Sequence, residues 1–507
     1  MKPIFTLRAW DVQIYRLCDD LSGPILMAML VFSPWAFGTT EHWSIWCMNV
    51  AGYVLGALLL VKLFIRGLKQ YPAPRWDHLS THSGRLSRRR HRWTTVLNRV
   101  LAGLTLAVLA YILISAVNGR ASYDAQTGTF QYRHFLSWLP HSFDVDRTWF
   151  YFWMYLGLAA SFWALVDWLP GMTATEERLV HTDEHGWDKA VPMFPARLRT
   201  LLWVLCLNGA LLGMESIIQR ASGSNKLLFL VVPHVHKEGE TQFGPYAYRS
   251  NAAQYFDLLW PLCLGFWWTL QRVSRGKAHH WLLLCAAVMA ACPIISASRG
   301  GALVSGGILV LAMVYVAFTG LTSFAGGRHG GASGHTAGLL VLFAAATIFL
   351  GWYFGWDTLA PRMEQIGEGY EFREAMYAAA GPMAADYPWF GVGPGTFATV
   401  FQLYRYSTEV YWPEQLHNDW LETRITFGWV GLSLLLAALG CVALRWFLPG
   451  GLRGSRRFAV LSWFGLGGCL IFGLFDFPFQ IHSTLFLFLV ICAVLFGLSG
   501  NPHPSRK

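Results

Sequence analysis

Long apolar stretches alternate with short polar segments along most of this chain. A helix that crosses a bilayer needs about 20 mostly apolar residues, and twelve stretches approach that length. They cover residues 21–39, 44–65, 97–117, 149–169, 200–218, 252–271, 281–297, 301–323, 336–356, 424–444, 458–475 and 481–499. The pattern predicts an all-α polytopic membrane protein with about 12 transmembrane helices.

The composition agrees with a membrane protein. Of the 507 residues, 54% are hydrophobic and 13% are charged, and this charged share is about half that of a typical soluble domain. The net charge of +10 could also indicate a nucleic-acid binder, but no soluble segment large enough to carry a basic face is visible. We therefore expect no nucleic-acid partner, and we expect the excess charge to set the topology and to contact anionic membrane lipids.

Basic residues also predict which side of the membrane each loop occupies. The linker between the second and third apolar stretches is rich in Lys and Arg, which places it in the cytoplasm by the positive-inside rule. Its basic residues are Arg66, Lys69, Arg75, Arg85, Arg88, Arg89, Arg90, Arg92 and Arg99. With this anchor, an even number of spans puts both termini in the cytoplasm and leaves three longer segments outside, at 118–148, 219–251 and 357–420.

The outward segment 357–420 is rich in aromatic residues, so we expect it to fold over the membrane. A helical pattern covers 370–380. The sequence G-V-G-P-G at 391–395 predicts a turn, because a phosphate-binding loop would follow a strand and would be followed by a Lys.

The polar cluster Q-L-H-N-D-W-L-E at 415–422 runs directly into an apolar stretch, and His417 lies at its centre. Asp419 and Glu422 have the spacing of a capping box, which would leave His417 just outside a helix N-terminus. The positive end of the helix dipole disfavours a charged imidazole, and a general base must be neutral. His417 is therefore a candidate catalytic base, with a structural histidine that bonds to loop backbone as the alternative.

Arg299 is the only charged residue between Trp281 and Phe318. A lone arginine at membrane depth is functional by default unless its side chain reaches out to the interface. Ser298 as a helix cap, together with the guanidinium, would form an anion site that suits phosphate.

Two further arginines lie in the outward segments, Arg249 in 219–251 and Arg373 in 357–420. Each alone is typical of a surface charge. Together with Arg299 and His417 they fall on one face of the membrane, as binding of a lipid diphosphate would require.

Two acids in another outward segment offer a competing chemistry. Asp144 and Asp146 form an Asp-x-Asp pair that could hold a divalent cation, or alternatively an acidic turn. The sequence has no zinc-binding His-Glu-x-x-His and no Gly-x-Ser-x-Gly nucleophile motif. Most of the nine cysteines lie in apolar stretches without metal-ligand spacing, so we predict no metal site.

One longer pattern connects these features. His417-Asn418 is followed by nine residues and then by Gly428-Trp429-Val430-Gly431. Further motifs lie in order along residues 240–495, namely F-G-P-Y-A-Y-R-S-N-A-A, S-R-G-G, R-E-A-M-Y, D-Y-P-W-F-G-V-G-P-G-T-F and F-D-F-P-F-Q-I-H. In this series the chain resembles the O-antigen ligases and the related exopolysaccharide polymerases, bacterial membrane proteins that transfer glycans from an undecaprenyl-diphosphate carrier.

The resemblance implies a GT-C-like fold and an inverting transferase that needs neither metal nor cofactor. By this resemblance His417 would activate the acceptor hydroxyl, and Arg299, Arg373 and Arg249 would bind the donor diphosphate. Asn418, Asp419 and Glu422 would support the histidine. The sequence departs from the commoner family pattern at 249–252, where Arg-Ser-Asn-Ala replaces an Asn-rich run.

The resemblance also implies a location and a domain plan. The protein would lie in the bacterial inner membrane with its active site on the periplasmic face. Residues 1–200 would form N-terminal spans with a basic cytoplasmic loop, 201–500 the ligase-like core with periplasmic loop 357–420 as a lid, and 501–507 a cytoplasmic tail.

Two alternatives stay open. The acceptor would be lipid A core in a ligase and a growing glycan in a polymerase, and the sequence does not decide between them. A transporter or flippase of lipid-linked oligosaccharides would place ionisable residues near the bilayer midplane, often in broken helices. Here the notable charges gather at one face, with Asp167 and Glu215 as exceptions near span ends.

Overall fold

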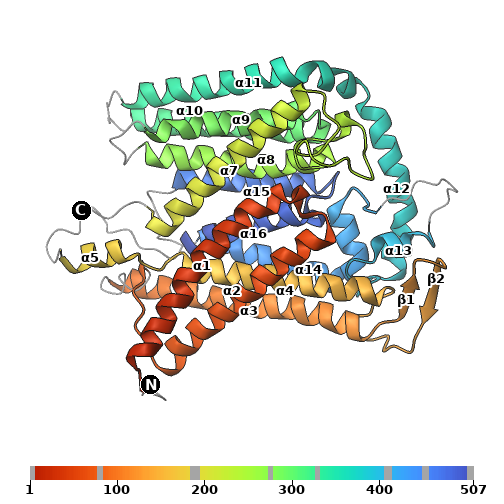
Figure 1. The fold of residues 1–507 in the computed structure, drawn as a ribbon, viewed down its shortest axis with the longest axis horizontal. Coiled ribbons are helices and arrows are strands. Elements are labelled where there is room, and N and C mark those ends of the chain that lie inside the picture. Colours follow the sequence, from red (N-terminus) through yellow and green to blue (C-terminus); the bar gives the residue numbers. More distant parts are fainter. Residues whose placement is uncertain are drawn as a thin grey trace.

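The computed structural model describes residues 6–76, 84–182, 194–271, 278–325, 332–404, 414–447 and 456–498. Within them, long helices form a bundle in which the helix axes lie roughly along one line (Figure 1). The bundle comprises α1 (Ala9–Trp35), α2 (His42–Leu68), α3 (Gly84–Val117), α4 (Val145–Trp168), α7 (Ala196–Ala221), α8 (Arg249–Leu270), α9 (Trp281–Ile295), α10 (Arg299–Ala325), α11 (Ala332–Glu364), α14 (Asp419–Phe447), α15 (Arg456–Phe472) and α16 (His482–Leu498). Each predicted apolar stretch falls on one of these helices.

The helices support a multi-pass membrane protein. Within the described ranges, eight are long and apolar enough to cross a membrane, namely α1, α2, α3, α4, α7, α10, α11 and α14. Two shorter helices, α9 and α16, are also apolar. The exact number of crossings therefore stays a prediction.

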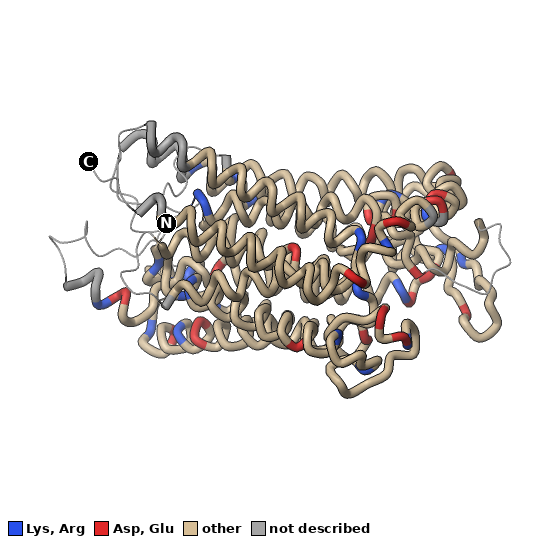
Figure 2. Tube along the Cα trace, turned by 90° about the horizontal axis from the view of Figure 1, so that it is seen from above, with Lys and Arg blue, Asp and Glu red and all other residues tan. Residues whose placement is uncertain are grey.

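Charged residues lie mainly toward the two ends of the bundle, and few lie in its middle (Figure 2). Helices α1 and α2 meet at one end, and alternating directions then bring the starts of α8, α10 and α14 to that same end. The structure does not test which end of the bundle is cytoplasmic, so the predicted sides stay a prediction. The side chains at 85–90 and the tail 501–507, both predicted to be cytoplasmic, lie outside the described residues.

Helix α8 lies at the core of the bundle and is buried along almost its whole length. Its closest approach to α15 depends on two glycines. A Cβ atom at Gly265 would lie 3.0 Å from the Phe458 backbone, and one at Gly465 would lie 3.0 Å from the carbonyl of Leu258. Small residues of this kind let membrane helices pack closely.

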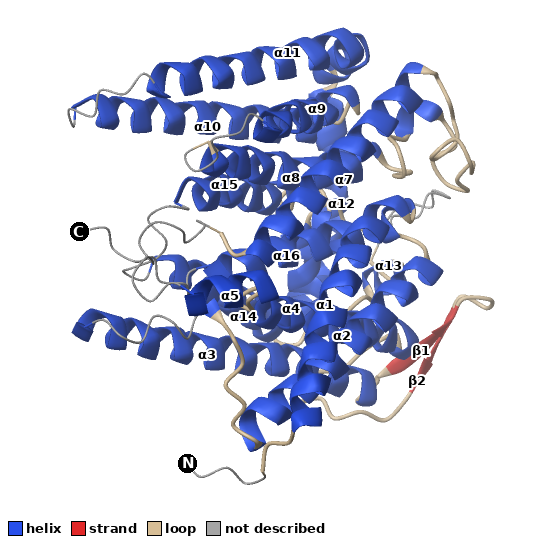
Figure 3. Cartoon of the chain, turned by 60° about the vertical axis from the view of Figure 1, so that its left-hand side comes forward, coloured by secondary structure: helices blue, strands red, loops and turns tan. Residues whose placement is uncertain are grey.

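Two outward segments form a cap over one end of the bundle. Segment 118–148 contains the antiparallel hairpin β1 (Ala121–Asp124) and β2 (Thr129–Tyr132), the small exception to the all-α prediction (Figure 3). In segment 357–420, α12 (Ile366–Asp386) runs across the end of the bundle and is followed by α13 (Phe397–Phe401). The predicted helix at 370–380 is thus confirmed as part of α12.

The cap has a hydrophobic core of its own, and both outward segments contribute to it. Phe143 packs there with Met383, Phe397 and Leu416. The predicted turn at 391–395 is also confirmed. Gly391 and Gly393 have φ values of 66° and 113°, and the Val392 and Gly393 amides donate to carbonyls of α14 at 2.9 and 3.0 Å.

The same loop interrupts α14. The apolar pattern at 424–444 predicts an unbroken helix, and this is wrong at Gly428, whose φ of 61° and ψ of −172° are not helical. A side chain at Gly428 would collide with the Trp389 carbonyl. The amides of Trp429 and Val430 instead donate to the carbonyls of Pro388 and Trp389 at 2.9 and 3.1 Å, so the break leaves these backbone groups paired.

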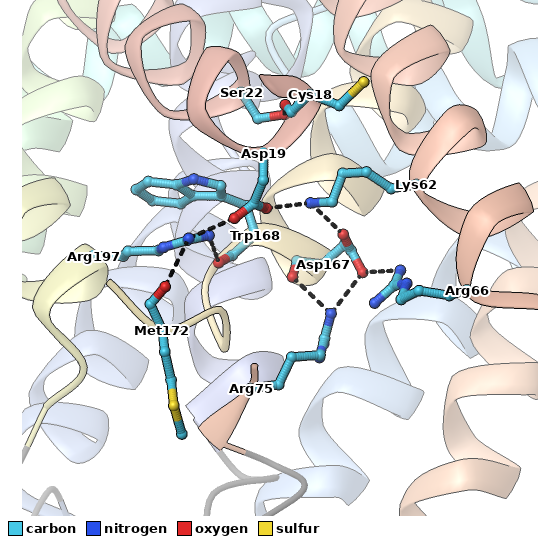
Figure 4. Close-up of polar contacts among 10 residues, drawn as sticks. All are labelled: Cys18, Asp19, Ser22, Lys62, Arg66, Arg75, Asp167, Trp168, Met172 and Arg197. Atoms are coloured by element: carbon cyan, nitrogen blue, oxygen red, sulfur yellow. Dashed lines mark hydrogen bonds and ion pairs between the residues drawn. The ribbon is translucent and has the colours of Figure 1, made fainter. Parts of the chain in front are cut away.

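A network of ion pairs joins four helices at the opposite end of the bundle (Figure 4). Lys62 contacts Asp19 at 2.6 Å and Asp167 at 2.7 Å. Asp167 also pairs with Arg66 and with Arg75, the latter at 2.9 Å. Two arginines of the predicted topogenic linker are therefore engaged inside the fold.

Candidate functional site

His417 lies immediately before α14, at the capped end of the bundle. Its φ of 57° is unusual for a residue with a side chain. The Tyr377 hydroxyl of α12 donates to the His417 carbonyl at 2.6 Å, and the Leu421 amide donates to Asn418 Oδ1 at 3.0 Å. The two bonds hold the His417 carbonyl and the residue after it, so the backbone that carries the imidazole is fixed where α14 begins.

The predicted capping box at Asp419 and Glu422 is wrong by one residue. Asn418 caps the helix, and Asp419 is already its first residue. Asp419 is free for a different role because Asn418 satisfies the helix end. Its carboxylate accepts from the Phe479 amide at 2.8 Å and from Gln480 Nε2 at 3.1 Å.

Glu422 also supports the loop before the helix. Its carboxylate accepts from the Leu416 amide at 2.8 Å. Glu422 therefore ties the residue before His417 to the start of α14, and Asp419 ties the segment after Asp476 to it. Neither carboxylate bonds to the imidazole.

The imidazole of His417 pairs with a buried carboxylate. His417 Nδ1 lies 3.1 Å from Asp476 Oδ1, and the two side chains are 19% and 2% exposed. An ionised carboxylate only accepts, so Nδ1 would donate in this bond, and in the neutral imidazole the lone pair would then lie on Nε2. A histidine oriented by a carboxylate in this way is suited to general-base chemistry.

Aromatic rings surround this pair. Phe477 lies edge-on to the imidazole with its centroid at 4.7 Å, and Tyr248 does the same at 6.1 Å. Tyr248 and Phe477 stack on each other at 5.7 Å. Burial raises the pKa of Tyr248 to about 12, so its hydroxyl stays neutral beside the histidine.

Arg299 begins α10, and the predicted cap is confirmed. The Gly301 amide donates to Ser298 Oγ at 3.1 Å. The guanidinium donates to the Gln365 carbonyl at 2.6 Å, at the junction of α11 and α12. Gly369 lies against the guanidinium, where a larger residue would collide with it. Arg299 therefore faces the cap segment.

Arg249 lies in the same region. Burial, and next the positive charge of Arg362, lower the pKa of Arg249 to about 10, with further contributions from Arg220 and Arg299. Arg249 donates to the Glu240 carbonyl at 2.7 Å. The guanidinium of Arg249 is therefore both removed from water and close to other positive charges, and a bound anion would favour its charged form.

Arg373 of α12 joins the group from the cap. Its charge lowers the pKa of both Tyr248 and Tyr377, although burial outweighs it at each. Tyr248 thus lies within electrostatic reach of Arg249 and Arg373 and in ring contact with His417. The structure brings the four predicted residues to one region.

Sequence reasoning missed three residues of this site, namely Asp476, Arg220 and Arg362. Asp476 was within reach, because it lies in the quoted motif F-D-F-P-F-Q-I-H. Arg220 ends an apolar stretch, and its guanidinium donates to the carbonyls of Gln242 at 2.8 Å and Ser296 at 3.2 Å.

The arginine cluster is defined as Arg220, Arg249, Arg299, Arg362 and Arg373. Among the described side chains, none of its members forms a salt bridge with an acid, whereas the arginines of the opposite end do. Backbone carbonyls hold three of them. The carboxylate of Glu240 favours the charged form of Arg220 and Arg362 without forming a salt bridge with either. Such a cluster is suited to an anion with several oxygens.

The Asp-x-Asp pair has a structural role, as the predicted acidic turn implies. Asp144 caps α4 by accepting from the Arg147 amide at 3.2 Å, and it accepts from the Thr399 hydroxyl at 3.0 Å. Asp146 is exposed in the first turn. No group of three or more His, Cys, Asp or Glu side chains suited to a metal occurs in the described part of the chain.

Comparison with known families gives one match that covers part of this site. Residues 284–436 match the O-antigen ligase family. The predicted family resemblance is thereby confirmed. The O-antigen ligase segment runs from α9 into α14 and includes Arg299, Arg373 and His417, whereas Arg249 and Asp476 lie outside it. A comparison with curated proteins gave no match.

Proposed function

We propose that this protein transfers a glycan from undecaprenyl diphosphate to an acceptor hydroxyl at the periplasmic face of the bacterial inner membrane. The observation that carries the proposal is the bond of 3.1 Å between His417 and buried Asp476. The nearby arginine cluster forms no salt bridge among the described side chains. The O-antigen ligase match supports glycan transfer as the reaction class.

The arginine cluster would bind the diphosphate of the donor. Each guanidinium that bonds to a backbone carbonyl keeps further N–H groups for phosphate oxygens. When the glycosyl bond breaks, negative charge grows on the departing diphosphate, and fixed positive charges stabilise that state more than the ground state. Because the arginines provide this charge, we propose a reaction without a metal.

His417 would act on the acceptor. Nε2 takes the proton of the acceptor hydroxyl while that oxygen attacks the anomeric carbon of the donor sugar. The bond from this carbon to the diphosphate oxygen breaks, and its electron pair leaves with the diphosphate. One displacement of this kind inverts the anomeric configuration. Asp476 stabilises the imidazolium that forms.

The chemistry needs no further cofactor, since the donor sugar is already activated by its link to diphosphate. The protein must only orient the two substrates, supply the base and exclude water. Helix α12 and the loop at 388–395 would form the lid that excludes water.

Ligase and polymerase differ only in the acceptor, and both fit this site. The transporter alternative gains nothing from the family match. Transporters also contain broken helices, whose free backbone groups bind the substrate or ion. In α14 the backbone groups at the break bond to the cap loop at 388–393 instead.

Transfer by purified protein tests the proposal. The donor is an undecaprenyl-diphosphate-linked oligosaccharide, the acceptor fractions are lipid A core and the oligosaccharide donor itself, and the product is followed by a mass shift of the acceptor. His417→Ala should lower the rate by about 10²–10⁴-fold, and a chelator should leave it unchanged. Full activity of a folded His417→Ala protein would exclude the general base.

A further inference from the structure

A second histidine, His236, lies beside the site and has no part in the reaction proposed above. It is half-buried and belongs to the segment between α7 and α8. Its imidazole stacks on the ring of Tyr248, with the centroids 5.4 Å apart and 27° between the ring planes. Tyr248 is also in ring contact with His417 at 6.1 Å. One tyrosine ring therefore connects the two histidines.

The backbone holds His236 in an unusual conformation. Its φ of 59° lies in the left-handed region, which few residues with a side chain adopt. The His236 carbonyl accepts from Gln242 Nε2 at 2.8 Å and from the Thr241 hydroxyl at 3.2 Å. Such a conformation persists only where its surroundings hold it, and examples cluster at functional sites.

The stretch that holds His236 also holds two members of the arginine cluster. The Arg220 guanidinium donates to the Gln242 carbonyl at 2.8 Å, and Arg249 donates to the Glu240 carbonyl at 2.7 Å. Gln242 thus bonds to Arg220 through its carbonyl and to His236 through its side chain. These bonds place His236 at the edge of the arginine cluster.

The environment of His236 favours a neutral imidazole. Burial, and next the positive charges of Arg249 and His417, lower the pKa of His236. The stacked Tyr248 is neutral as well, because burial raises its pKa to about 12. A diphosphate bound at Arg249 would offset that positive charge and add negative charge nearby, and both changes favour the imidazolium.

Other charged side chains near His236 have less influence on it. Lys237 and Glu238, which follow it in the chain, are exposed and opposite in sign, and Glu240 is exposed too. Three other members of the arginine cluster add positive charge around Arg249. Arg249 has the largest effect of any charge on His236. A ligand that binds Arg249 therefore acts on the charge to which His236 is most sensitive.

We propose that His236 takes up a proton from the solvent when a diphosphate binds to the arginine cluster, and that the imidazolium then donates a hydrogen bond to a phosphate oxygen. The inference rests on the proposed function and adds a binding residue for the leaving group. His417 keeps the role of the base. The extra positive charge at His236 would exist only while the diphosphate is bound.

Proton uptake on binding is measured by isothermal titration calorimetry in two buffers of different ionisation enthalpy. The sample is the full-length protein in detergent micelles, without an acceptor. The probe is farnesyl glucosyl diphosphate, a diester in which no group titrates near neutral pH. At about pH 7 we expect wild type to take up roughly 0.5–1 proton for each probe bound. The affinity should fall as the pH rises, because the bound form holds more protons.

His236→Asn removes the titrating group and introduces a residue that also accepts a positive φ. It should bind the probe without proton uptake and with an affinity lower by roughly 10–100-fold, the effect of one charge-assisted hydrogen bond. His236→Gln serves if this variant does not fold. His234→Asn is the matched control, because it changes an exposed histidine of the same segment, and it should behave like wild type.

Two outcomes overturn the inference alone. One is binding by wild type without proton uptake. The other is uptake that persists in folded His236→Asn and disappears in His417→Ala, which would place the proton on His417. A wild-type protein that does not bind the probe would overturn the proposed diphosphate site as well. Full transfer activity of folded His417→Ala would contradict the proposed base, whereas uptake that depends on His236 would still support this inference.

Discussion

His417 and Asp476 form the contact on which the chemistry depends, and each contributes through a different atom. The carboxylate holds Nδ1 as a donor, and this leaves Nε2 as the only site for the acceptor proton. Asp476 also accepts from the Phe477 amide at 3.1 Å, so its own orientation is fixed by the backbone.

Asp476→Asn tests the charge of this carboxylate. An asparagine keeps the size, and its oxygen can still accept both bonds that Oδ1 receives, from His417 Nδ1 and from the Phe477 amide, but it has no negative charge to stabilise the imidazolium that forms. We expect kcat to fall by about 10²–10⁴-fold, with KM and the thermal unfolding midpoint unchanged. Asp146→Asn, at an exposed position, is the matched control and should leave all three quantities unchanged.

Arg299→Lys tests the charge geometry of the cluster. Lysine keeps the charge but loses the fork of N–H groups that bonds to both the Gln365 carbonyl and a phosphate oxygen. One charge-assisted hydrogen bond is worth about 1.5–3 kcal/mol, which corresponds to roughly 10–100-fold in kcat/KM. Arg147→Lys on α4 provides the control, measured in the same transfer assay. Wild-type kcat/KM for Arg299→Lys would rule out bidentate phosphate binding by this residue.

At the scale of elements, the break in α14 links the cap to the bundle. The loop at 388–393 bonds to both sides of Gly428, and Tyr111 of α3 donates to the Phe390 carbonyl at 2.6 Å and the Phe427 carbonyl at 2.9 Å. Backbone hydrogen bonds therefore attach the cap to α14 at the break. In an unbroken helix the amides of Trp429 and Val430 would bond within the helix and could not bind the cap.

Gly428→Ala should destabilise the protein. The φ and ψ of Gly428 fall in a region that only glycine populates, which costs other residues on the order of 1–3 kcal/mol, and the Trp389 carbonyl leaves no space for a methyl group. Gly440→Ala, on the same helix with open space around it, should be neutral or slightly stabilising. Equal thermal unfolding midpoints for the two variants in detergent would contradict this account.

The sequence allowed much of the helical framework to be predicted, because a run of about 20 apolar residues has few alternatives in a bilayer. Local signals were also readable, such as the Ser298 cap and the position of His417 before a helix. The pairing of His417 with Asp476 was not, since 59 residues separate them and only the fold brings them together. The break at Gly428 was missed for a similar reason, because its cause is the backbone of a distant loop.

At the scale of the whole molecule, the two ends of the bundle use charge in opposite ways. At the site end, the arginine cluster forms no salt bridge among the described side chains, whereas the other end pairs its charges inside the fold (Figure 4). There Asp19 of α1, Lys62 of α2 and Asp167 of α4 connect three helices, and Arg197 of α7 joins through Asp19. We infer that the first end is built for a ligand and the second for stability.

Asp167→Asn tests this division of roles. Asp167 is the partner of Lys62, Arg66 and Arg75, and Lys62 is 2% exposed. Removal of one partner from a buried ion pair costs about 3–5 kcal/mol, because the remaining charges lose their compensation away from water. We expect a clear fall in the thermal unfolding midpoint and in the free energy of unfolding measured by SDS titration.

The same variant should leave catalysis intact where it is folded. The network lies at the end of the bundle opposite His417, so kcat and KM measured well below the unfolding temperature should equal those of wild type. Asp476→Asn is expected to show the reverse, with lost activity and retained stability. A loss of kcat in folded Asp167→Asn would mean that the two ends are coupled, and the assignment of one end to the ligand and the other to stability would then be wrong.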